Sequence, residues 1–139
     1  MNAQPVPVPD IDAAMVIGMA SAAIPFARSR EDQAERWLRI LRMHGEAGMA
    51  LHELGVSEGP VEGEHAQHEA SSEAPAGDVV ADVSDAAARA AEQRGSHAVE
   101  TRDVLIAVMD IYGGDFDHVL SAHGAGREEL IQRLALQAA

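Results

Sequence analysis

The chain has 139 residues and a formal net charge of -13, with ten arginines and no lysine. This charge argues against binding to nucleic acid or to an anionic membrane surface, and the missing lysine excludes Schiff-base chemistry and the lysine of a phosphate-binding loop. Cysteine is absent, which excludes a disulfide scaffold, a thiol nucleophile and a cysteine-ligated metal site, and an aromatic share of 3% predicts an alanine-rich, helical core.

Residues 1–9 are predicted to form an extended arm, because they contain three alternating prolines. A helix is expected to begin at Asp10 or Asp12, either of which can cap exposed backbone amides. It continues through the apolar run 13–24, which a proline ends. No cation precedes this run, and it is shorter than the roughly 20 residues that a bilayer requires. It therefore indicates a buried, central helix rather than a signal peptide or a membrane span.

A second helix should be capped by Ser29 and should carry its apolar residues at helical spacing. Gly45 interrupts this pattern, and a short third helix follows and ends at Gly55. The inward-facing residues of the second helix are expected to be Ala34, Trp37, Leu38 and Leu41.

The segment 57–78 is predicted to be a flexible acidic linker. The wider window from Met43 to Ala88 contains ten acidic residues and no arginine, and its middle is rich in glycine, proline and serine. A segment of this composition does not bury enough apolar surface to offset the entropy of ordering it. The linker divides the chain into two structured parts.

The helical pattern then starts again. An alanine-rich helix is expected over 84–94, and a second helix should be capped by Thr101 and broken at Gly113–Gly114. A short helix that opens at Asp115 and a last helix over 126–137 follow. No stretch alternates with period two for long enough to predict a strand. The predicted fold is all-α, with about seven helices.

The two parts are predicted to be copies of one unit of three or four helices. Ser29 aligns with Thr101, and Gly45 aligns with Gly113–Gly114. The motif L-x-x-L-G-V that begins at Leu51 likewise aligns with the sequence L-x-x-H-G-A later in the chain. Internal similarity of this kind indicates a repeat architecture.

The second copy resembles the Clp repeat, which forms the N-terminal domain of Clp-type AAA+ unfoldases. The resemblance is carried by the alanine-rich run 87–92, by the segment Val-Glu-Thr-Arg-Asp-Val-Leu-Ile-Ala-Val over 99–108, and by the glycines and the Val119–Leu120 pair that follow. In the first copy, residues 38–56 are similar to the same unit.

This resemblance implies one domain over residues 10–139, in which repeat one (10–56) and repeat two (79–139) form a pseudo-twofold bundle. In the family this domain docks adaptors and substrates for an unfolding motor and performs no chemistry. The chain has no G-x-x-x-x-G-K-[ST] motif for ATP hydrolysis. We therefore expect a non-enzymatic, cytoplasmic module that binds proteins or peptides and uses no cofactor. The partners that the resemblance implies are Clp unfoldase or protease components, their substrates, and cyclic peptides, and the module would be an adaptor, decoy or modulator of Clp proteolysis.

The candidate binding residues lie at the starts of the second helices, where a groove between the two copies is expected. Some Clp repeats bind phosphoarginine through an acidic residue after the capping threonine, but arginine stands at that position in both copies. This reversed charge should repel a guanidinium group, which argues against phosphoarginine binding. The candidate residues are Phe26, Ser29, Arg30, Val99, Thr101 and Arg102.

Two alternatives from other classes stay open. An exposed apolar stripe would make the protein a structural homo-oligomerisation module, and the histidines would make it a small metal-binding protein or a small enzyme. The best histidine cluster, His65-x-x-His68, falls in the acidic linker and is interpreted as a solvated tract rather than a metal site. No G-x-S-x-G or H-E-x-x-H motif is present. Five methionines fall at core spacing and are predicted to be packing residues rather than a binding face: Met15, Met19, Met43, Met49 and Met109.

Overall fold

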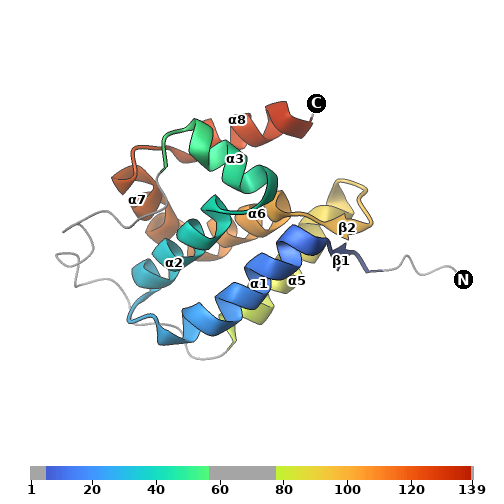
Figure 1. Cartoon of the computed structure of the whole chain (residues 1–139), viewed down its shortest axis with the longest axis horizontal. Coiled ribbons are helices and arrows are strands. Elements are labelled where there is room, and N and C mark those ends of the chain that lie inside the picture. The colour runs from blue at the N-terminus through green and yellow to red at the C-terminus, as the bar shows by residue number, and fades with distance from the viewer. Residues whose placement is uncertain (1–5, 57–77, 139) are drawn as a thin grey trace, which may run out of the picture.

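The computed structural model describes residues 6–56 and 78–138 of the chain. Within them lie seven α-helices, one 3-10 turn and a ladder of two short strands, so the predicted all-α fold is confirmed (Figure 1). Most of the acidic linker, with His65 and His68, lies outside the described residues. None of the helices in the described stretches is long and apolar enough to cross a membrane. In chain order the elements are β1 (Val8–Pro9), α1 (Ile11–Ala23), η1 (Ile24–Phe26), α2 (Arg30–Arg42), α3 (Gly45–Glu53), α5 (Val79–Gln93), β2 (Ala98–Val99), α6 (Thr101–Tyr112), α7 (Gly114–Ala122) and α8 (Arg127–Ala138).

Polar caps start the first two helices where the sequence predicts. The Asp10 carboxylate accepts a hydrogen bond from the backbone N–H of Ala13 at 2.8 Å, and the Ser29 hydroxyl accepts one from Asp32 at 3.0 Å. At the start of α3, Gly45 has a φ of 59°, a conformation that glycine adopts without strain.

Two helix starts in the second half differ from the prediction. α5 begins five residues earlier than expected, because Asp78 accepts a hydrogen bond from the N–H of Ala81 and caps the helix there. At α6, Glu100 is the N-cap and forms a capping box with Asp103, whose carboxylate accepts the Glu100 N–H at 2.8 Å. The prediction that Thr101 caps its own helix is therefore wrong.

A short parallel ladder joins the N-terminal arm to the segment before α6. Val8 pairs with Ala98 and Pro9 with Val99, and the N–H of Asp10 donates to the Val99 carbonyl at 2.9 Å. The sequence did not predict these strands, since two residues are too few to show a period-two pattern. The ladder anchors the start of α1 beside the start of α6.

Equivalent helices of the two halves make equivalent contacts with the other half. α2 packs on α7 and α6 packs on α3, so the second helix of each half contacts the third helix of the other half. α2 and α6 also pack on each other and run antiparallel, because Arg30 at the start of α2 bonds to Ile111 near the end of α6. This arrangement is the one expected of a pseudo-twofold pair of helical units (Figure 1).

A single core runs through both halves and is mostly aliphatic, as the composition predicts. Two of its aromatic residues belong to a short hydrogen-bonded chain: the Trp37 indole N–H donates to the Tyr112 hydroxyl at 3.1 Å, which donates to Gln33 Oε1 at 2.8 Å. These bonds join α2 to α6 inside the core. The largest fully buried side chains are Trp37, Phe116, Ile24, Leu38, Leu41, Leu51, Leu105, Met109, Leu120, Leu130, Val16 and Val56.

Candidate functional site

Arg30, at the start of α2, is held by the end of α6 and the start of α7. Its Nε donates to Asp115 Oδ2 at 3.1 Å and its Nη2 donates to the Ile111 carbonyl at 2.8 Å. The guanidinium also lies 5.2 Å from the centre of the Tyr112 ring, within cation–π range. This arginine therefore has an acidic partner and an aromatic partner inside the protein.

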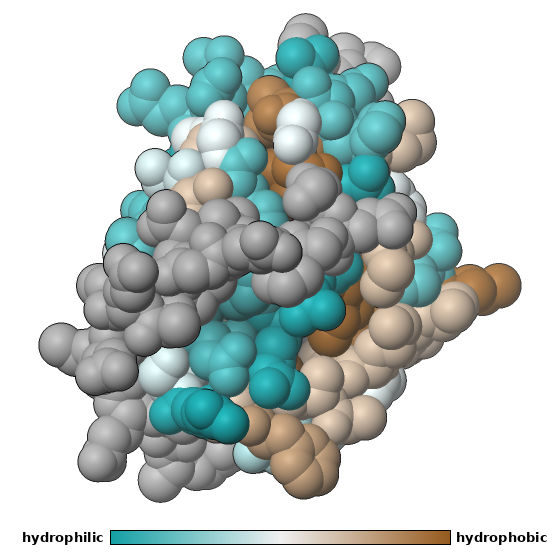
Figure 2. Space-filling view, turned by 60° about the vertical axis from the view of Figure 1, so that its left-hand side comes forward, coloured by the Kyte–Doolittle hydropathy of each residue, from teal (hydrophilic) through white to brown (hydrophobic). Residues whose placement is uncertain are grey.

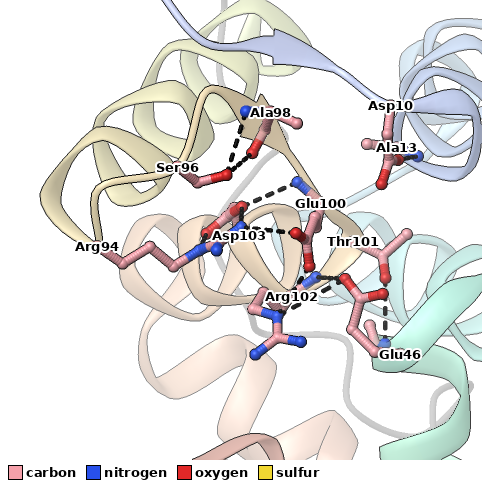
Figure 3. A network of polar contacts seen from close by, with 11 residues as sticks. Asp10, Ala13, Glu46, Arg94, Ser96, Ala98, Glu100, Thr101, Arg102 and Asp103 are labelled. Atoms are coloured by element: carbon pink, nitrogen blue, oxygen red, sulfur yellow. Dashed lines mark hydrogen bonds and ion pairs between the residues drawn. The ribbon is translucent and has the colours of Figure 1, made fainter. Parts of the chain in front are cut away.

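Thr101 and Arg102, at the start of α6, are held by the start of α3 in the same way (Figure 3). The Thr101 hydroxyl accepts a hydrogen bond from the N–H of Ala47 at 3.1 Å, and Arg102 Nε lies 3.2 Å from Glu100 and 3.8 Å from Glu46. Burial alone would raise the pKa of the Glu46 carboxyl. The backbone N–H groups of Glu46 and Arg102, the Thr101 hydroxyl and the Arg102 charge together outweigh burial and lower this pKa.

Thr101 thus supplies a helix cap across the boundary between the halves. His44, the N-cap of α3, makes no side-chain capping bond, and the hydroxyl of Thr101 satisfies the N–H of Ala47 in its place. Thr101 is fully buried, so this contact is part of the interface between the halves.

The six candidate residues do not form one groove. Because α2 has 13 residues and runs antiparallel to α6, the Arg30 and Arg102 clusters lie roughly 20 Å apart, at opposite ends of the helix pair. Val99 is 2% exposed and Thr101 is fully buried, so neither presents a side chain to a partner. Phe26, by contrast, is 76% exposed on η1.

The exposure of four methionines was not predicted from the sequence. Of the five predicted to be packing residues, only Met109 is buried, and Met15, Met19, Met43 and Met49 are 39–61% exposed. The expectation of a central first helix is also wrong, because α1 buries only Ala13, Val16 and Ala20 and lies at the surface. The composition of α1 was the available signal: all of its residues except Asp12 and Ser21 are apolar, so a side that the fold does not cover is mostly an exposed apolar face.

We define the methionine face as Ile11, Met15 and Met19 on α1 together with Met43, His44 and Met49 at the α2–α3 junction. The α1 residues recur every fourth position, and Ile11 is 80% exposed. Met19 Sδ lies 3.3 Å from His44 Nε2, so the stripe on α1 meets the junction directly. In Figure 2 the outer side of α1 is the pale-brown band at the lower right of the molecule.

An open pocket of about 610 Å³ lies at the junction end of the methionine face. Of the methionine face, only Met43, His44 and Met49 line it; its other lining residues are Arg42, Gly45, Gly48 and His52. At Gly48 an added Cβ would lie 2.7 Å from the Arg42 carbonyl, so glycine lets α3 approach the end of α2 closely. The pocket offers apolar side chains for a partner to bury against, and it is bordered by the polar groups of Arg42, His44 and His52.

Beside the large residues, the outer side of α1 carries a parallel row of small ones: Ala14, Gly18 and Ala22, all exposed. A Cβ added to Gly18 would meet nothing within 4 Å. A glycine inside a helix costs about 1 kcal/mol relative to alanine, and the fold of the chain itself gives no packing reason for it here.

The exposed charges of α1 and of α5 are mostly acidic. Residues 1–27 contain no arginine or lysine, and Asp12 is exposed on α1. α5 packs along α1 and exposes Asp82, Asp85 and Glu92 against a single exposed arginine, Arg89. A molecule that approaches the stripe from the side of α5 therefore meets an excess of negative charge, whereas one at the junction end meets Arg42.

Two histidines that the sequence left unassigned pair with glutamates of α2. His118 Nε2 lies 3.1 Å from Glu31, and His123 Nε2 lies 3.1 Å from both carboxylate oxygens of Glu35. These pairs join α7 to α2. Within residues 6–56 and 78–138, no three or more His, Cys, Asp or Glu side chains are grouped so that they could hold a metal ion.

A comparison of the chain with protein-family models, with curated proteins and with solved structures finds no match in any of the three.

Proposed function

We propose that the protein is a non-enzymatic module that binds other proteins or peptides, and that the methionine face is its binding surface. The observation that carries this proposal is α1, a helix whose residues are apolar except for Asp12 and Ser21 but which is buried on only one side. Contiguous exposed apolar surface of this kind marks interaction sites in monomeric proteins. Methionine suits such a site, because its unbranched, polarisable side chain adapts to partners of different shape.

The resemblance to the Clp repeat supports the same class of function, since the family's domain docks proteins for an unfolding motor. On this proposal the partners belong to the Clp system or its substrates, which a cytoplasmic protein would meet. The two arginine clusters hold the halves together, and the methionine face, rather than the ends of α2 and α6, does the docking.

Peptide selection tests the proposal. A display library is selected on the wild-type protein and the enriched peptides are then tested on a Met15→Glu, Met19→Glu double variant. Met15 is 49% and Met19 39% exposed, so the variant should fold, and circular dichroism and thermal unfolding check this. Ile131→Glu on α8, a position that is 47% exposed outside the methionine face, is the matched control.

The expected result is that the enriched peptides bind the wild type and the control but lose at least about tenfold in affinity for the double variant. Methyl NMR of the methionines gives a second measurement: Met15, Met19, Met43 and Met49 should shift on binding, and the buried Met109 should not. The proposal is overturned if no peptide is enriched or if the double variant binds as tightly as the wild type. Concentration-dependent self-association that the double variant abolishes would instead make this face a homo-oligomerisation surface.

A further inference from the structure

We propose that the partner of the methionine face is a cationic amphipathic helix that lies along α1. This inference rests on the proposed function and names the chemistry of the partner. Three kinds of occupant would bury an apolar helix face: a second copy of the chain, a lipid surface, or a helix from another protein. Charge and shape separate them.

Charge disfavours the first two occupants. Two copies that each carry a net charge of -13 repel each other, and this repulsion opposes a face-to-face dimer. Helices that lie on membranes carry lysine or arginine beside their apolar side, but the first 27 residues contain neither. The exposed acids of α1 and α5 would also repel anionic lipid headgroups.

The same acids favour a cationic protein partner. Asp12 on α1 and Asp82 and Asp85 on α5 are exposed on the two helices that pack side by side. Lysine or arginine residues on the polar side of a helix bound on the α5 side of α1 would meet a neighbouring helix whose exposed acids outnumber its one exposed arginine, Arg89. Complementary charge of this kind speeds the encounter and selects the partner, while apolar contact holds it.

The shape of α1 favours a helix over an extended peptide. Ile11, Met15 and Met19 form a ridge with a spacing of four residues, and Ala14, Gly18 and Ala22 form a groove beside it. Ridges of this spacing pack into the grooves of a second helix. A glycine in the groove lets the partner's backbone approach closely, which accounts for Gly18, a residue that the fold itself does not require.

Two synthetic peptides that share the same apolar residues test the proposal on the full chain. One carries lysine at every polar position and the other carries glutamate, and their affinities are measured by fluorescence anisotropy. The lysine peptide should bind at least about tenfold more tightly than the glutamate peptide at low salt, and the difference should shrink as salt rises. Asp82→Asn with Asp85→Asn should weaken the lysine peptide about fivefold. Glu128→Gln with Glu129→Gln, on exposed positions of α8, is the matched control and should leave it unchanged.

Gly18→Leu tests the placement along α1. Because Gly18 is exposed and its Cβ position is open, the variant should fold, and the leucine should fill the groove and weaken the lysine peptide at least about tenfold. Unchanged or tighter binding by this variant would overturn the proposed packing.

Other outcomes also overturn the inference. Equal affinity for the two peptides would refute the cationic partner and leave the proposed function standing. Binding of the lysine peptide without a shift of the Met15 and Met19 methyl groups would place it elsewhere, for example on the acidic segment 57–77. If neither peptide binds, the cationic helix is refuted, and the library selection decides the proposed function separately. Phosphatidylcholine vesicles that shift the methionine signals when neither peptide does would assign the face to lipid.

Discussion

Replacing Thr101 with valine isolates the cap that one half of the protein supplies to the other. Valine keeps the branched shape of threonine but has no hydroxyl, so the N–H of Ala47 loses its acceptor at 3.1 Å. Both residues are fully buried, and water therefore does not replace the lost bond. A buried donor left without a partner costs about 1–3 kcal/mol, a range that includes the usual cost of losing a helix cap. We expect the Thr101→Val variant to lose stability in this range.

Urea unfolding, followed by the fluorescence of the single tryptophan, measures the loss. With an m value of about 2 kcal/mol/M, the midpoint should fall by about 0.5–1.5 M while m stays constant. Thr101→Ser keeps the hydroxyl and is the control, which should retain most of the stability. A midpoint that valine leaves unchanged, or that serine lowers as far as valine does, would refute the cross-half cap.

Three further predictions concern the same interface and the core. Gly45→Ala should destabilise the fold by at least about 2 kcal/mol in thermal unfolding, because φ is 59° there and the new Cβ would lie 2.5 Å from Thr101 Oγ1. Combining this change with Thr101→Ala should recover the steric part of the loss. If the two losses of stability are strictly additive, the contact between residues 45 and 101 is contradicted. Asp103→Asn should lower the free energy of unfolding in urea by about 2–4 kcal/mol, because the fully buried Asp103 carboxylate accepts two hydrogen bonds from Arg94, at 2.8 and 2.7 Å. A near-neutral result would show that this ion pair is not needed for stability. Burial raises the pKa of Tyr112 from its ordinary 10 to about 12, although the Trp37 hydrogen bond and the Arg30 charge oppose it. The contribution of this tyrosine to the free energy of unfolding should therefore be complete below pH 10 and be lost as pH rises toward 12. Tyr112 is the only tyrosine, so an ultraviolet absorbance titration reads this pKa directly, and titration near pH 10 in the folded protein would contradict it.

Local signals in the sequence were sufficient for most of the helices. Asp10 and Ser29 cap the helices that they were predicted to cap, because an N-cap depends on backbone groups only two or three residues away. Gly45 and Gly55 both adopt positive φ at the helix boundaries where the sequence placed them. The all-α class follows from the same short-range information together with a composition poor in aromatic residues.

Local sequence signals do not determine which residue caps α6. The sequence Glu100-Thr101-Arg102-Asp103 contains two polar residues that are able to cap, and nothing local chooses between them. The choice depends on Ala47, more than fifty residues earlier, whose buried N–H requires an acceptor. Thr101 turns to that N–H, and Glu100 caps α6 with the help of Asp103.

The methionine face also depends partly on local sequence and partly on tertiary packing. Composition alone establishes that α1 is mostly apolar, since Asp12 and Ser21 are its only polar residues. Which side faces the core depends on where α2, α5 and α6 pack, and those contacts join residues far apart in the chain. Helical spacing reports which residues share a side, but burial is a property of the neighbours that cover that side. The sequence therefore specifies an apolar helix that contains Met15 and Met19. Only the packing of the other helices determines that these two methionines stay exposed to a partner.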